Sequence, residues 1–423
     1  MNYEEILHRE VMPALGCTEP IAVAYAAAWA RKTLGQPVER MEVNASRNIL
    51  KNAMSVGIPG TDMAGLPIAA ALGAIGGRTD VGLEVLGSIT PEQAAQGMDM
   101  VRAGKIVVSQ KQGVEALYIE VVVSGGGHSA EAIIRRTHTH VTDLLCDGTV
   151  IKHDELEELS AHGGESDPMT VHEIFQFCQT VPAEKLSFLR EGIELNMAAA
   201  KEGLDGRYGL SVGHNIAATG ASSNLMGSDI GTCAVATTAA ACEARMAGAK
   251  VPVMSVAGSG NQGLVCTLPV VIFAQKCDVG QERLLRAVAL SDLVTIHIRR
   301  GIGRLSPLCG CGIAAAVGAS CGILSVLGGN EQQMNYAIKN MVANVTGMVC
   351  DGAKSGCAVK VATAVSAAVQ CAVLAINNAH VPSIDGIVDS DVEQTIRNLG
   401  SIGRDGMAQT DQVILDMMTS KAL

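Results

Sequence analysis

Aromatic residues are scarce in this sequence: they make up 2% of its 423 residues, with a single tryptophan. Large rings therefore do not fill the interior, which must be packed by alanine, glycine, valine and leucine, and the 47 glycines fit helices that approach closely. At about 100 to 200 residues per domain, the length predicts two or three domains with a large core.

Positive charge is also in deficit. The 31 lysines and arginines are outnumbered by 42 acidic residues, giving a net charge of −11. This balance excludes a nucleic-acid backbone as the main partner. Charged residues of all kinds reach only 17%, which excludes a disordered chain.

Long apolar runs are missing as well, so we expect no membrane-spanning helix. The most apolar segment, 358–376, contains Lys360, Ser366 and Gln370, and it predicts a buried helix. The opening residues MNYEEILHRE have neither a basic start nor an apolar run, so we expect no secretion signal. We therefore expect a cytoplasmic protein.

Cysteine, by contrast, is plentiful. There are 13, an odd number, and in a reducing compartment they are expected to stay thiols or to bind metal. Cys242 and Cys266 lie in apolar or Ala-rich runs, where cysteine packs as a small hydrophobic residue.

Strand-like segments are confined to the first part of the chain. β-Branched residues predict strands at 41–46, 105–110, 116–124 and 130–146, the second and third joined as a hairpin by KQGVEA. Helices are expected between them, and Ala-rich helices dominate after residue 165, at 230–247, 280–298, 312–326, 331–345 and 357–376. The predicted fold class is α+β: residues 1–165 form an α/β domain with a partly antiparallel sheet, and residues 166–423 form an all-helical domain.

The segment GCTEP near the start carries the first chemical signal. Thr18 is a candidate N-cap, and the helix dipole favours Glu19 in the first turn. Cys17 then lies just ahead of a helix N-terminus, a position that lowers a thiol pKa and favours anions. The alternative is a common helix cap that follows a buried cysteine.

Loop-borne cysteines late in the chain carry the second signal. LCGCG contains Cys309 and Cys311, and CDGAKSGC contains Cys350 and Cys357. Neither spacing matches the C-x-x-C pairs usual for zinc. Iron–sulfur clusters accept more varied spacing, and three ligands would leave one iron open to act as a Lewis acid.

Glycine- and asparagine-rich loops carry the third signal. The loop AGSGNQG lacks the lysine of a phosphate-binding loop, but its backbone and amide groups suit a small carboxylate or amino group. The alternative is tight helix packing around glycine. The histidines 138 and 140 alternate on a predicted strand and are expected to be surface or satisfied residues. The residues expected to bind such a small carboxylate or amino group are Thr18, Glu19, Asn52, Ser259, Gly260, Asn261, Gln262 and Gly263.

Five segments, in the order in which they occur, resemble the L-cysteine desulfidase family: GCTEP, SVGIPGTDMAG, SGNQG, RLSPLCGCG and MVCDGAKSGCAVK. That family is related to the iron–sulfur L-serine dehydratases through their α-chain domain. The resemblance implies an oxygen-sensitive [4Fe–4S] cluster held by three cysteines, without pyridoxal phosphate. Cys350 and Cys357 match two of the cluster ligands of that family. The third ligand matches either Cys309 or Cys311, and Cys309 is favoured. Cys17 matches the proton acceptor of the family.

The implied reaction is β-elimination of L-cysteine to pyruvate, ammonia and hydrogen sulfide. Dehydration of L-serine on the same cluster is one alternative, and a non-catalytic iron–sulfur or redox-sensing protein is another. The predicted partners are the amino-acid substrate and a second copy in a homodimer, with no nucleic acid and no membrane.

Overall fold

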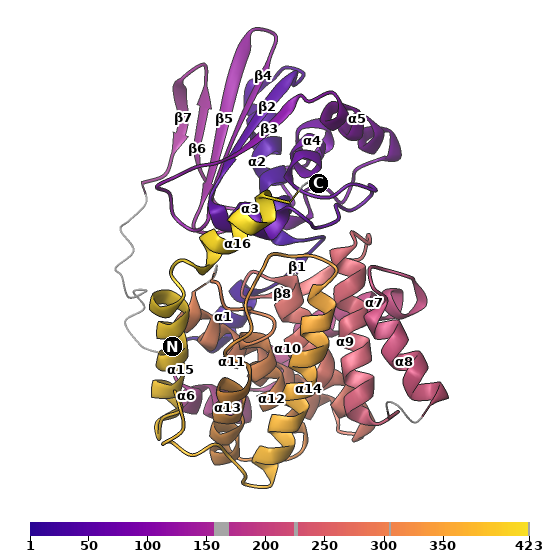
Figure 1. Ribbon diagram of the computed structural model, residues 1–423, viewed down its shortest axis with the longest axis vertical. Helices are drawn as coiled ribbons and strands as arrows, with labels where there is room; N and C mark the ends of the chain where they lie inside the picture. Colours follow the sequence, from indigo (N-terminus) through magenta and orange to yellow (C-terminus); the bar gives the residue numbers. More distant parts are fainter. Residues whose placement is uncertain (156–168, 224–226, 304–305, 422–423) are drawn as a thin grey trace.

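The computed structural model describes residues 1–155, 169–223, 227–303 and 306–421 (Figure 1). A sheet with its covering helices forms one part of the molecule, and a bundle of helices forms the other (Figure 1). The predicted α+β class is confirmed.

The sheet has six strands in the order β3-β2-β4-β5-β6-β7. Only the β2–β3 pair is parallel and the remaining pairs are antiparallel, as the partly antiparallel prediction requires. Helix α2 packs on β4, β5 and β6, α4 packs on α2, and α5 packs on α4. The bounds are α2 Thr18–Leu34, β2 Arg40–Ala45, α3 Arg47–Ala53, α4 Leu66–Gly76, η1 Gly82–Glu84, α5 Pro91–Arg102, β3 Ile106–Gln110, β4 Tyr118–Gly125, β5 His128–Arg135, β6 Val141–Cys146 and β7 Thr149–His153.

The predicted hairpin between β3 and β4 is wrong, because β2 lies between them. Met41 of β2 pairs with Ile106 on one edge and with Val123 on the other. Strands are spaced by about 4.8 Å, so crossing over one strand needs about 10 Å, which the connecting residues 111–117 span easily.

The strand expected at 130–146 is also two strands rather than one. Arg136 has a positive φ of 65°, and the chain turns there before β6 begins. His138 and His140 therefore lie in a turn and do not share a strand face. His140 Nε2 lies 3.1 Å from Asp154 Oδ2, whereas His138 is buried.

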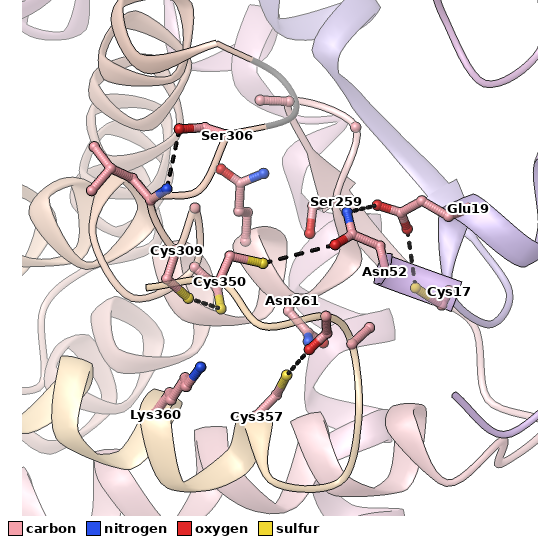
Figure 2. Close-up of a pocket in the computed structure, with 18 of the residues that line it drawn as sticks. Cys17, Glu19, Asn52, Ser259, Asn261, Ser306, Cys309, Cys350, Cys357 and Lys360 are labelled. Atoms are coloured by element: carbon pink, nitrogen blue, oxygen red, sulfur yellow. Dashed lines mark hydrogen bonds between the residues drawn. The ribbon is translucent and has the colours of Figure 1, made fainter. Parts of the chain in front are cut away.

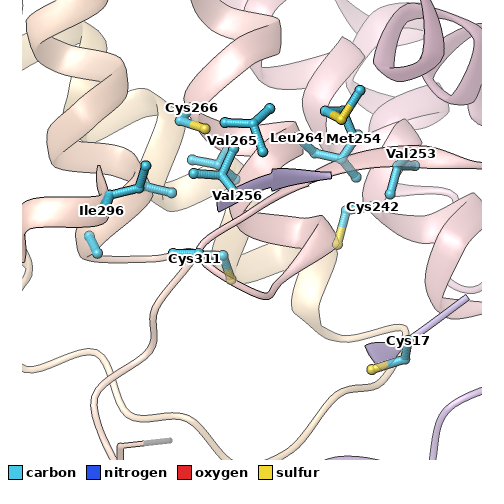
Figure 3. Packing of buried hydrophobic residues seen from close by; sticks show 14 of the residues in the cluster. Cys17, Cys242, Val253, Met254, Val256, Leu264, Val265, Cys266, Ile296 and Cys311 are labelled. Atoms are coloured by element: carbon cyan, nitrogen blue, oxygen red, sulfur yellow. The ribbon is translucent and has the colours of Figure 1, made fainter. Parts of the chain in front are cut away.

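Small residues build the helical part, as the composition predicts. A Cβ on Gly203 of α7 would lie 2.0 Å from the Ala240 carbonyl oxygen of α9, and one on Gly213 of α8 would also collide with α9. Cys242 and Cys266 are buried in the apolar core (Figure 3). The bounds are α6 Val171–Thr180, η2 Ala183–Leu186, α7 Leu189–Asp205, α8 Val212–Ser222, α9 Ile230–Met246, α10 Gly260–Lys276, α11 Gln281–Ile302, α12 Ala314–Val326, α13 Glu331–Val345, α14 Cys357–Ile376, α15 Val392–Ser401 and η3 Ile402–Gly406.

Helix α14 is long and apolar enough to cross a membrane, judged by length and composition alone, and it is the one such helix among the described residues. Within its most apolar window 44% of the residues are buried. One side packs on α9, α12 and α13, while Val359 and Leu374 are exposed on the other. The prediction of a buried helix therefore holds for one face.

Both ends of the chain connect the two parts. Near the start, α1 (Tyr3–Glu10) contacts α11, and β1 (Val11–Ala14) pairs with β8 (Val253–Val256), a short strand within the otherwise helical part. At the other end, α16 (Thr410–Thr419) packs on α3 of the sheet part. The predicted boundary at residue 165 falls outside the described residues.

Candidate functional site

A cavity of about 90 Å³ lies where residues from the two parts meet. It is small beside the roughly 300–1,000 Å³ of sites for drug-sized ligands, so it suits a small substrate. Most of the predicted site residues line it, whereas Thr18, Gly260 and Gly263 do not. The lining residues are Cys17, Glu19, Asn52, His138, Arg245, Ala257, Gly258, Ser259, Asn261, Gln262, Arg299, Ser306, Leu308, Cys309, Gly310, Cys311, Cys350, Asp351, Gly352, Ala353, Cys357 and Lys360.

The start of α2 supplies one wall of the cavity. Cys17, not the predicted Thr18, is the N-cap: its backbone is extended and its carbonyl accepts from the amide of Ile21 at 3.2 Å. Thr18 is in the first turn, and its hydroxyl donates to Glu19 Oε2 at 3.0 Å. The helix start thus presents Cys17 and Glu19 to the cavity, with Thr18 behind them.

Cys17, Glu19 and Asn52 form a hydrogen-bonded set (Figure 2). The Cys17 thiol donates to Glu19 Oε2 at 3.1 Å, and Asn52 Nδ2 donates to Glu19 Oε1 at 3.0 Å. Asn52 Oδ1 also lies 3.9 Å from Cys350 Sγ on the facing wall. Asn52 therefore connects the carboxylate to a cysteine loop.

The protonation of this set differs from the sequence prediction. Burial, and next the negative charge of Glu19, raise the pKa of Cys17 well above its usual range. Burial also acts to raise the pKa of Glu19, but the charge of His138 and the hydrogen bond from Cys17 outweigh it and lower that pKa. The expected lowering of the Cys17 pKa is wrong: the resting pair is a thiol beside a carboxylate, because desolvation overrides the helix N-terminus.

Two cysteine loops build the opposite wall. An isolated bridge joins Leu308 to Val349, with the Cys309 amide donating to the Met348 carbonyl at 2.9 Å and the Cys350 amide donating to the Pro307 carbonyl at 2.7 Å. Cys357 begins α14 after the second loop. Figure 2 shows Cys309, Cys350, Cys357 and Lys360 on one side and Cys17 and Glu19 on the other.

The thiols on this wall interact with one another. Cys309 Sγ and Cys311 Sγ are 3.5 Å apart, and this contact is the largest cause that lowers the pKa of Cys309 to about 6 and raises that of Cys311. Burial, and next the charge of Cys309, raise the pKa of Cys357 to about 11. Burial raises the pKa of Cys350, and the charge of Cys309 adds to that rise.

Residues 257–259 connect β8 to α10, so the predicted glycine- and asparagine-rich loop is only partly a loop, and residues 260–263 form the first turn of α10. Asn261 Oδ1 accepts from Arg245 Nη1 at 2.9 Å, and Gln262 Oε1 accepts no hydrogen bond from the residues that the structure describes. Gly263 is a packing residue, because a Cβ there would lie 1.9 Å from the carbonyl oxygen of Met254. The alternative of tight packing thus explains this glycine, and the amide side chains face the cavity.

Four basic side chains of the cavity wall escaped the sequence analysis as site residues: His138, Arg245, Arg299 and Lys360. Arg245 and Arg299 are nevertheless buried, and both lie on largely apolar helices. Arg245 could have been found as the one basic residue of the buried, Ala-rich helix α9, and Lys360 by its place three positions after Cys357. Arg299 carries no such signal, because other arginines lie on the same helix.

The donor set suits a thiolate-bound cluster better than a single ion. Among the described residues, no three His, Cys, Asp or Glu side chains surround a point where one metal ion could bind. Cys309, Cys350 and Cys357 all line the cavity, and a cluster takes its ligands from around a wider space than a single ion does. Arg299 and Lys360 lie close enough to Cys309 to lower its pKa, and they would offset the negative charge of bound thiolates.

Comparison with known proteins gives consistent matches. Residues 80–416 match the family described as serine dehydratase alpha chain. A UPF0597 protein of Oleidesulfovibrio alaskensis is 49% identical over 421 residues, covering 99% of this chain and 98% of the relative. UPF0597 proteins of Bacteroides fragilis and Clostridium tetani are 46% and 43% identical, each over at least 98% of this chain and 97% of the relative. The family match includes both cysteine loops, and the relatives also cover GCTEP.

Proposed function

The chain belongs to the serine dehydratase alpha chain family, and from this premise we propose that it is an iron–sulfur lyase whose substrate is L-cysteine. The enzymes of this family use iron–sulfur clusters. The observation that carries the proposal is that the two cysteine loops and the Cys17–Glu19–Asn52 set line the same cavity and face each other across it.

In this proposal Cys309, Cys350 and Cys357 would hold a [4Fe–4S] cluster. Cys309 is preferred to Cys311 because its amide donates to the carbonyl of Met348, two residues before Cys350, which ties it to the second loop. When bound, the cluster would supply a Lewis-acidic iron that makes the leaving group of the substrate easier to expel.

The substrate itself has complementary groups on the cavity wall. Arg299 is a buried cation that can bind a carboxylate, and Gln262 Oε1 is a buried acceptor suited to an amino group. Asn261 holds Arg245 in place and so shapes the same wall. These groups suit the carboxylate and the amino group of a small α-amino acid.

Cys17 and Glu19 would manage the proton from the substrate Cα as a relay. Because the pKa of Cys17 is raised, its sulfur carries a proton at rest and cannot act alone as a base. Glu19 Oε2 is 3.1 Å from that sulfur and has a lowered pKa. The thiol proton passes to Glu19 as Cys17 accepts the proton from Cα, in the manner of a nucleophile activated by an adjacent base.

The overall reaction balances without an electron partner. Loss of the Cα proton and of hydrosulfide leaves aminoacrylate, which tautomerises to an imine. One water molecule then hydrolyses the imine, so that L-cysteine and water give pyruvate, ammonia and hydrogen sulfide.

Dehydration of L-serine is the second candidate, and the family match to a serine dehydratase chain favours it. The same residues would move the same proton, and water would leave in place of hydrosulfide. A thiolate is the softer ligand and the better match for iron, which is why we place L-cysteine first.

Anaerobic purification followed by iron and product assays tests the proposal. We expect about four irons per chain, and release of sulfide and pyruvate from L-cysteine faster than pyruvate from L-serine. Cys350→Ala and Cys357→Ala should lose iron, whereas Cys371→Ala, a buried thiol further along α14, should keep it. A wild-type protein without iron refutes the cluster, and one with full iron that converts neither amino acid refutes both proposed reactions.

A further inference from the structure

Lys51 is a fully buried lysine that the proposed reaction does not use. It lies on α3 and is 1% exposed. Its Nζ is 2.5 Å from Asp411 Oδ1 and donates to the Cys350 carbonyl oxygen at 3.0 Å. One ammonium group therefore joins α3 to the last helix, α16, and to a cysteine loop.

The acidic partner is itself held in place. Asp411 is buried, and its second oxygen, Oδ2, accepts from Asn48 Nδ2 at 2.6 Å. Asn48 and Lys51 are three residues apart on the same helix. Both carboxylate oxygens of Asp411 are therefore bound by side chains of α3. A buried charge is stable only when paired and hydrogen-bonded in this way.

The backbone of the cysteine loop lies directly on the end of α3. The Ala353 amide donates to the Asn52 carbonyl at 3.2 Å. Gly352 has a φ of +90°, and a Cβ there would lie 2.2 Å from the Lys51 carbonyl oxygen. Only glycine permits this approach, so the loop is fitted to α3 at the position of Lys51.

From these contacts we propose that Lys51 and Asp411 are positioning residues, through which helix α16 holds the 350–357 loop in its ligand-binding shape. This inference rests on the proposed function, because it concerns the loop that would hold two cluster ligands. Lys51 points at the main chain of Cys350 and is not among the cavity-lining residues. Lys51 therefore acts on the cavity from behind the loop, through the main chain of Cys350 and the charge placed beside that residue.

The primary test uses the cluster-free full-length protein and hydrogen exchange of its backbone amides. In Asp411→Asn the charge partner of Lys51 is lost while the side-chain shape is kept. We expect amides of 350–357, Ala353 among them, to exchange about ten- to a hundredfold faster, as loss of a charge-assisted hydrogen bond implies. The matched control is Asp416→Asn on the same helix, whose carboxylate accepts from Gln412 at the surface.

The second readout is iron retention by the anaerobic protein in the presence of a chelator. Asp411→Asn should lose iron several-fold faster than Asp416→Asn, and Lys51→Met should do the same. Unchanged exchange in the loop overturns the inference even if the wild type holds a full cluster. A wild type without iron overturns the proposed function, while faster loop exchange in Asp411→Asn alone would still support the positioning role. If Lys51→Met does not fold, Asp411→Asn decides the question.

Discussion

Replacing Glu19 by glutamine separates two roles for Cys17. If Cys17 acts alone as a thiolate, removing the neighbouring negative charge lowers its pKa and should make the enzyme faster. If Glu19 must receive the thiol proton, the same change should make the enzyme slower. The sign of the effect on turnover therefore decides between them.

The structure sets the expected size of this effect. Glu19 Oε2 is the described acceptor of the Cys17 proton, at 3.1 Å, and glutamine cannot take up a proton there. Loss of a general base costs about 10²- to 10⁴-fold in rate, or about 2.7–5.4 kcal/mol. Thr18→Val is the matched control, because it removes the other side-chain donor to Glu19 Oε2. The loss of this hydrogen bond should raise the activation free energy by only about 0.5–1.5 kcal/mol.

Three measurements complete the assay: sulfide release, exchange of the substrate Cα proton with solvent, and iron content. Glu19→Gln should lose the first two and keep its iron, because Glu19 forms no described hydrogen bond with a cysteine of the two loops. Cys17→Ser should behave similarly, since a hydroxyl is a far weaker acid than a thiol. Glu19→Gln with equal or faster turnover and full iron would refute the relay and leave the cluster proposal intact.

Further predictions concern the third ligand, the substrate loop and a buried acid. Cys309→Ala should lose iron, whereas Cys311→Ala should retain most of it; equal losses would place the third ligand elsewhere. Asn261→Ala should raise KM for cysteine more than it lowers iron content, and an unchanged KM would remove that residue from the site. Burial raises the pKa of Asp292 to about 7, against about 3.9 when unfolded. The folded state therefore holds the extra proton between these values, and stability falls as pH rises from about 4 to 7. Asp292→Asn should remove the part of this fall that lies between pH 5 and pH 8, on the order of 3 kcal/mol, in urea unfolding at those two pH values, and parallel pH profiles would contradict it.

Much of this protein is determined by local sequence. The scarcity of rings and the abundance of alanine and glycine specify closely packed helices, which Gly203 and Gly213 confirm against α9. The two cysteine loops and GCTEP are contiguous segments, so their residue types alone mark candidate chemistry. Helix ends, strands and loop cysteines can be predicted from the sequence, because the residues that produce each of them lie within a few positions of one another.

The tertiary structure decided what depends on distant partners. β2 lies between β3 and β4, although the two flanking strands are adjacent in sequence. His138 and Arg299 reach the cavity from separate elements, and Lys51 finds Asp411 some 360 residues away. No local pattern carries such pairings.

Cys17 shows the physical reason most directly. Its place at a helix N-terminus can be read from five letters and predicts a lowered pKa. The desolvation that raises the pKa instead comes from the folding of distant segments over the thiol, and the strength of an electrostatic interaction depends on how much water that folding removes.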